Sequence, residues 1–159
     1  ENLNGTDFIP KYLGESKTKL KIFLLGATED TVSKTFGIWS HAYKQHSWCG
    51  YHNGYFDKNN CQSLLEKIKH SGANTLIVAM GNPLQEKWIY QYKDQMEIDL
   101  AIGVGALFDF VAGKVERAPN LIQTLKLEWA YRLLQEPKRL WRRYIIGNAV
   151  FLRNCLKEW

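Results

Sequence analysis

Short apolar runs alternate with amphipathic stretches along the first two thirds of the chain. The two clearest runs, LKIFLL and TLIVAM, have the length and composition of buried strands. The pattern predicts four strands, at residues 20–25, 47–51, 75–80 and 100–104. Apolar residues at helical spacing predict intervening helices at 29–43, 60–70 and 83–96, the last with Pro83 at its first position. This alternation predicts an α/β fold: a Rossmann-like parallel sheet with helices on both faces.

The pattern changes at about Pro119, where strands give way to two expected helices, at 119–135 and 137–156. The charge changes in the same region. Residues 1–116 carry 12 Lys and Arg against 13 Asp and Glu, whereas residues 117–159 carry 9 against 3 and include six aromatic residues. We therefore expect an α/β body at 1–116 and a basic, aromatic-rich helical appendage at 117–159.

Several kinds of site are disfavoured by the sequence. The three cysteines are far apart and form no CxxC pair, so neither a zinc site nor a disulfide framework is indicated, and a reducing compartment is expected. The histidines at 41, 46, 52 and 70 have no metal-ligand spacing and are expected mostly at the surface, and the chain contains no Asp-x-Asp pair. We expect neither a metal nor a cofactor. No signal peptide is visible, and the apolar run 145–152 is far shorter than the roughly 20 residues that span a bilayer.

Parallel sheets bind ligands at the carboxyl ends of their strands, so the residues that follow each strand are the candidates for chemistry. Gly26, before Thr28, would let backbone amides approach a phosphate, although a glycine here also serves packing. The glycine- and ring-rich segment 50–56 would form a wall against a base or sugar, or pack over the sheet edge. In the segment 81–86, Asn82 is a candidate ligand contact or helix cap. Asp109 is likewise a candidate ligand contact or helix cap. The nearby Gly103-Val104-Gly105 segment is not interpreted as a dinucleotide site because it lacks the third glycine of that motif.

Seven ordered segments together resemble the TagA/WecG/CpsF family of bacterial glycosyltransferases. They are Asn4–Asp7, Phe23–Gly26, Asn53–Phe56, Gly81–Trp88, Gly103–Gly105 with Phe108–Asp109, Gly113 with Arg117–Pro119, and Leu127–Leu133 with Glu136–Arg139. No single segment is decisive, but their order over nearly the whole chain is specific.

The resemblance implies a metal-independent, inverting transfer from a UDP-sugar to an undecaprenyl-diphosphate-linked saccharide. The implied setting is the synthesis of a cell-surface polysaccharide or teichoic acid at the cytoplasmic face of the bacterial inner membrane. The donor sugar stays open among N-acetylmannosamine, its uronic acid, glucose and glucuronic acid. The basic appendage looks like the family's membrane-docking region, with an anionic membrane surface as partner.

Site residues follow from combining the resemblance with the strand-end positions. We expect sugar and acceptor contacts, and hence catalytic residues, at Asn82, Gln85 and Glu86. We expect UDP-sugar donor and diphosphate contacts at Asp7, Gly26, Thr28, Gly54, Tyr55, Gly81, Gly105, Asp109, Arg117, Arg132, Arg142 and Arg143. Each arginine would also suit a solvated helix face; as a group, with the aromatics, they favour interfacial binding.

Two departures from the family pattern qualify these expectations. Members carry a proposed general base, an Asp in an Asp-Gly segment, in a region before the part that this chain matches, so a truncated chain is expected. Asn2 stands at or near a position where members often have Arg. Two other classes stay open: a catalytically inactive sugar-nucleotide-binding or scaffold domain, and a nucleic-acid-binding module suggested by the pI of about 9.1. The core-like spacing of most aromatics disfavours nucleic acid as a partner. Homo-oligomerisation is left open.

Overall fold

The computed structural model describes residues 5–116, 118–119, 122, 127–135 and 137. The chain divides into two compact units, Glu1–Val115 and Glu116–Trp159. In order, the elements of the first unit are α1 (Gly5–Glu15), β1 (Lys21–Gly26), α2 (Glu29–Ala42), β2 (Ser47–His52), α3 (Gln62–His70), β3 (Thr75–Ala79), α4 (Leu84–Tyr92), the 3₁₀ turn η1 (Lys93–Gln95), β4 (Leu100–Gly103) and α5 (Leu107–Val111).

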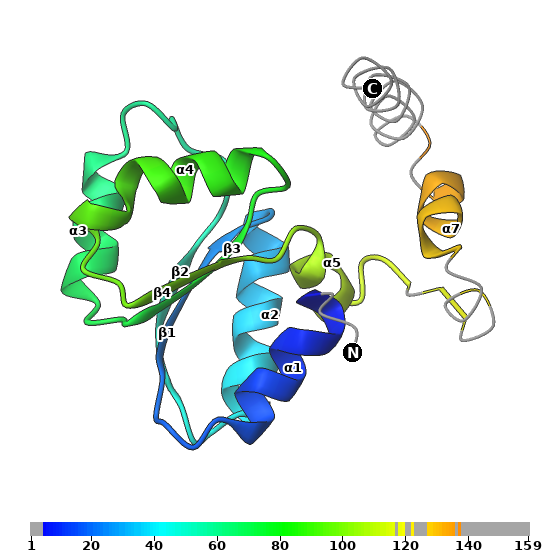
Figure 1. Ribbon diagram of the computed structural model, residues 1–159, viewed down its shortest axis with the longest axis horizontal. Coiled ribbons are helices and arrows are strands. Elements are labelled where there is room, and N and C mark those ends of the chain that lie inside the picture. The colour runs from blue at the N-terminus through cyan, green and yellow to red at the C-terminus, as the bar shows by residue number, and fades with distance from the viewer. Residues whose placement is uncertain (1–4, 117, 120–121, 123–126, 136, 138–159) are drawn as a thin grey trace, which may run out of the picture. The chain divides into compact units, whose positions relative to one another are not determined.

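The four strands form one parallel sheet in the order β2-β1-β3-β4 (Figure 1). The two central strands are buried on both faces: every residue of β3 is buried, and in β1 only Lys21 is exposed. Continuous apolar runs such as LKIFLL suit this position because a strand with helices above and below has no solvated face. The predicted Rossmann-like parallel sheet is confirmed.

Helices cover both faces of this sheet, as Figure 1 shows. On one face, α1, α2 and α5 enclose a core that includes Leu13, Leu24, Trp39 and Phe108. On the other face, α3 and α4 enclose a second core that includes Phe23, Leu65, Leu76 and Trp88. Each central strand therefore contributes alternate side chains to two separate cores.

The predicted strands and helices of the body are present, with two differences. Pro83 caps α4 instead of forming its first turn, and it follows a cis peptide bond from Asn82. The expected helix 83–96 ends at Tyr92 and continues as the 3₁₀ turn η1.

The sequence pattern predicted neither the short helix α5 nor helix α1. Pro10 and Gly14 lie inside it, and both disfavour a helix interior. Its burial of Ile9 and Leu13, which are four residues apart, offsets that cost. His46, expected at the surface, is instead buried beneath this helix: its Nδ1 accepts from the Leu20 amide and its Nε2 donates to the Leu13 carbonyl at 2.8 Å.

The described part of the second unit contains α7 (Glu128–Gln135). Of the expected helix 119–135, residues 120–121 and 123–126 lie outside the described residues, and so does nearly all of the expected helix 137–156. Within the part of the chain that the structure describes, no helix has the length and apolar character needed to cross a membrane.

Candidate functional site at the carboxyl ends of the strands

The strand order places a topological switch point between β1 and β3. The chain leaves β1 through α2 toward β2, whereas it leaves β3 through α4 toward β4, on the opposite side. Loops that diverge in this way open a crevice at the carboxyl ends of the strands, where open α/β sheets bind ligands.

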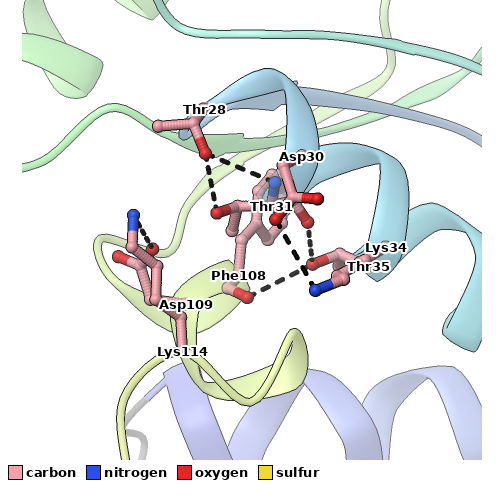
Figure 2. Close-up of polar contacts among 8 residues, drawn as sticks. All are labelled: Thr28, Asp30, Thr31, Lys34, Thr35, Phe108, Asp109 and Lys114. Carbon is pink, nitrogen blue, oxygen red and sulfur yellow. Dashed lines mark hydrogen bonds and ion pairs between the residues drawn. The ribbon is translucent and has the colours of Figure 1, made fainter.

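The turn between β1 and α2 is tight and tied to its neighbour. Gly26 has φ of 129°, and a Cβ there would lie 2.3 Å from the carbonyl oxygen of Ala79, so only glycine fits. The next residue, Ala27, has φ of 53° and donates its amide to the same Ala79 oxygen at 2.8 Å. Thr28 then caps α2, its Oγ1 accepting from the Thr31 amide at 3.3 Å (Figure 2).

The loop after β2 packs directly against that turn. The Gly54 amide donates to the Ala27 carbonyl at 2.8 Å, and a Cβ on Gly54 would lie 3.2 Å from the Ala27 nitrogen. Asn53 donates to Glu29 of α2 at 2.8 Å and accepts from the Tyr55 amide at 2.9 Å. The loop therefore brings Gly54 against Gly26, while Tyr55 projects with 79% of its surface exposed.

The loop after β3 leads into α4, whose first turn carries a buried amide side chain. Gly81 has φ of 82°, and Asn82 and Glu86 are exposed. Gln85 is only 3% exposed; its Oε1 accepts from the Gly105 amide at 3.1 Å and its Nε2 donates to Glu86 Oε1 at 2.8 Å. Gln85 thus joins the β3 and β4 loops and orients the Glu86 carboxylate.

The loop after β4 begins with Gly105, at φ of 59°, and leads into α5. Ala106 is the N-cap of α5, so Asp109 is not its cap. Asp109 Oδ1 lies 3.9 Å from Lys114 Nζ, and the Phe108 carbonyl accepts from Thr35 Oγ1 of α2 at 3.2 Å (Figure 2). Figure 2 shows Thr28 and Asp109 in one neighbourhood, with α5 beside the start of α2.

Some of the expected site residues contact one another in the structure. Gly54 packs against Gly26 at the β1 turn, which Thr28 follows, and Gln85 binds both Glu86 and Gly105. Asp7 lies in the first turn of α1, whose Gly5 approaches Val104 of the β4 loop. Arg117, Arg142 and Arg143 lie outside the described residues, as does the side chain of Arg132 in α7.

Lys58 is a residue of this region that sequence reasoning did not single out. Its Nζ donates to the carbonyls of Gly54 and Phe56, each at 2.7 Å, and lies 3.9 Å from the centre of the Phe56 ring. Burial lowers the pKa of Lys58, and the nearby Asp57 and Cys61 oppose that shift. The available signal was a lysine four residues after the loop glycine, which is weak by itself.

A pocket of about 390 Å³ lies along the outer side of β2. Its lining comes from α2, β2 with its following residue, and α3: Glu29, Phe36, Gly50, Tyr51, His52, Asn53 and Lys67. Within the described part of the chain, no cluster of three or more His, Cys, Asp or Glu side chains is arranged to hold a metal ion.

The protein family of this chain follows from its similarity to known families. The model of the glycosyl transferase WecG/TagA/CpsF family matches residues 1–159. The chain belongs to this family. The resemblance seen in the seven ordered segments is therefore confirmed, and these segments include the end of β1 and residues of the loops after β2, β3 and β4.

A curated relative supports the assignment to the WecG/TagA/CpsF family. The chain is 34% identical over 155 residues to the N-acetylglucosaminyldiphosphoundecaprenol N-acetyl-beta-D-mannosaminyltransferase of Bacillus subtilis (strain 168). That match covers 97% of this chain and 59% of the relative, so the chain spans less than two thirds of the relative's length.

Proposed function

We propose that this protein transfers a sugar from a UDP-sugar to an undecaprenyl-diphosphate-linked saccharide, with inversion and without a metal. The observation that carries the proposal is the family match over residues 1–159, together with a relative whose name specifies a diphosphoundecaprenol acceptor. The sequence contains no Asp-x-Asp pair, the usual means of holding a metal against a sugar nucleotide, which supports the metal-independent form.

The donor nucleotide is proposed to occupy the crevice at the switch point. Its contacts would come from the backbone around Gly26 and Thr28, from Gly54 and Tyr55, and from Asp109. The N-terminus of α2 supports this placement because helix amides and the helix dipole favour a phosphate there. Asp7, Gly81 and Gly105 complete the donor contacts that we propose within the body.

The sugar and the acceptor hydroxyl are proposed to lie against the start of α4. Asn82 and Glu86 are exposed there and offer an amide and a carboxylate to hydroxyl-rich ligands. Gln85 acts on the reaction through Glu86 and the Gly105 amide, both of which it binds. The family resemblance assigns the general base to an aspartate in an Asp-Gly segment outside these 159 residues.

The departing UDP requires charge stabilisation, which helix N-termini and arginines supply when no metal is used. Arg117, Arg132, Arg142 and Arg143 are proposed for this role. Calorimetry of the chain with UDP, GDP and ADP, with and without EDTA, tests the donor site. We expect UDP to bind most tightly and EDTA to have no effect; metal-dependent binding or a preference for ADP would contradict the proposal.

Residues 117–159 are proposed to dock on the anionic cytoplasmic face of the inner membrane, which brings the site to its lipid-linked acceptor. They carry a net charge of +6 and six aromatic residues, and each basic residue near such a surface contributes about 1 kcal/mol. Co-sedimentation with anionic vesicles should be lost after truncation at Arg117 and weakened by an Arg139/Arg142/Arg143→Glu variant. Equal sedimentation of the intact chain, the truncated chain and the arginine variant would refute docking, as would sedimentation of none of them at low salt.

A further inference from the structure

The ammonium group of Lys58 bridges two carbonyls of the loop that follows β2. Lys58 Nζ donates to the carbonyls of Gly54 and Phe56, each at 2.7 Å, so it bridges the residues on either side of Tyr55. The same ammonium lies 3.9 Å from the centre of the Phe56 ring, close enough for a cation–π contact. Both carbonyls that flank the projecting tyrosine are thus fixed by one group.

Lys58 and Phe56 are themselves anchored on the neighbouring helix. The Tyr92 hydroxyl of α4 donates to the Lys58 carbonyl at 2.8 Å, and the Phe56 ring packs edge-on against Trp88 with a centroid distance of 5.8 Å. Trp88 and Tyr92 are buried in the core beneath α3 and α4. The lysine bridge is therefore connected to a rigid part of the fold.

The other side of the loop contacts the turn after β1. The Gly54 amide donates to the Ala27 carbonyl at 2.8 Å, and the Ala27 amide donates to Ala79 at the end of β3. Lys58 consequently fixes a loop that connects the ends of β1, β2 and β3. Tyr55 is the part of this loop that remains 79% exposed.

We propose that Lys58 is a positioning residue, which holds the Gly54–Phe56 loop so that Tyr55 is presented to the donor nucleotide. The identity of the ligand in this inference rests on the proposed function, whereas the loop geometry does not depend on it. A loop that is ordered before binding loses less conformational freedom when the ligand arrives, which raises affinity. Two of the three N–H donors of the Lys58 ammonium are used by protein carbonyls, and on this geometry we assign its effect to the loop and not to a phosphate contact.

Lys58→Met tests this proposal because it keeps the length of the stem and removes the ammonium. The matched control is Lys69→Met, which removes an exposed lysine paired with Glu97 at 2.6 Å in the last turn of α3, at the opposite end of that helix from the loop. We expect Lys58→Met to weaken binding of UDP and of uridine by the same factor, about tenfold, which corresponds to about 1.4 kcal/mol. Lys58→Arg, which keeps a cation with several donors, should bind within about twofold of wild type.

The double variant Lys58→Met/Tyr55→Ala separates positioning from direct contact. If Lys58 acts through Tyr55, Lys58→Met has no further effect once the ring is gone. Loss of affinity for UDP but not for uridine would show instead that the ammonium binds the diphosphate, and additive losses would also overturn the proposal. Unchanged affinity in Lys58→Met would do the same.

Hydrogen exchange without ligand tests the loop itself. We expect the Gly54 amide to exchange at least about tenfold faster in Lys58→Met than in wild type or Lys69→Met, because local opening exposes it. Unchanged exchange would overturn the role of Lys58 whether or not UDP binds. If wild type binds neither UDP nor uridine, the proposed function fails while the exchange result still decides the loop. If Lys58→Met does not fold, Lys58→Arg is measured in its place. Hydrogen exchange and affinity equal to those of wild type support the proposal. Faster exchange and weaker binding in a folded Lys58→Arg protein contradict it.

Discussion

The contact between Gly103 and Gln85 gives a quantitative test of the link between the β3 and β4 loops. A Cβ at Gly103 would lie 2.6 Å from Gln85 Nε2 and 2.9 Å from its Cδ. Gly103 is not among the residues with positive φ, so alanine there meets a steric obstacle and no backbone strain. Gly103→Ala therefore requires Gln85 to move away from its place.

The cost of this movement follows from the hydrogen bond that it breaks. Gln85 Oε1 accepts from the Gly105 amide at 3.1 Å, and a partly buried amide left without a partner costs about 1–3 kcal/mol. For a chain of this size, each 1 kcal/mol lowers Tm by about 2–4 °C. We therefore expect Gly103→Ala to lower Tm by several degrees, and Gln85→Ala to lower it by at least as much.

The double variant Gly103→Ala/Gln85→Ala distinguishes a direct steric contact between the two residues from two independent destabilising effects. In the Gln85→Ala background the side chain that obstructs the new methyl group is absent, so Gly103→Ala should cost less than about 0.5 kcal/mol there. Urea and thermal unfolding of the four proteins measure the coupling. Gly37→Ala is the control: Gly37 is exposed in α2 with nothing within 4 Å of its Cβ position, so alanine should stabilise by about 0.5–1 kcal/mol. Additive costs, or a neutral Gly103→Ala in the wild-type background, would refute the reasoning.

The effects of two further substitutions and the rate of one chemical reaction are predicted. Gly26→Ala should destabilise the chain by at least about 2 kcal/mol in urea unfolding, because strained backbone and a crowded core each cost about 1–3 kcal/mol and its Cβ would lie 2.3 Å from the carbonyl oxygen of Ala79; a cost below about 1 kcal/mol would contradict the turn geometry. Thr35→Val should cost about 1–2 kcal/mol in the same assay, since it removes a buried hydroxyl that lies 2.8 Å from the Thr31 carbonyl oxygen and 3.2 Å from that of Phe108; unchanged stability would show that this hydroxyl contributes nothing. Burial raises the pKa of the Cys49 thiol, and nearby Lys21 opposes that shift, so at pH 8 Cys49 should be alkylated by iodoacetamide more slowly than a cysteine in a short peptide, as followed by mass spectrometry; an equal rate would contradict it.

Local pattern was sufficient to predict the body's strands, most of its helices and the loops that face the candidate site. Continuous apolar runs such as TLIVAM are distinctive because a strand buried on both faces can carry no solvated side chain. The family resemblance was also visible in the sequence, since it depends on short segments in a fixed order. Helix α1 was not predicted because Pro10 and Gly14 oppose the local propensity, and its stability comes from tertiary burial of Ile9 and Leu13.

The roles of individual site residues depend on contacts between distant parts of the chain, which spacing does not encode. The expected sugar contact of Gln85 stays a prediction, whereas its 3% exposure and its bond to the Gly105 amide, 20 residues later, arise from the packing of α4 against β4. Lys58 was not singled out from the sequence, because the two carbonyls around its ammonium come together only in the folded loop. The sequence by itself therefore determined the strands, the strand ends and the family. Only the tertiary structure decided which polar groups at those ends are exposed to a ligand, because burial and hydrogen-bond partners arise when the loops meet.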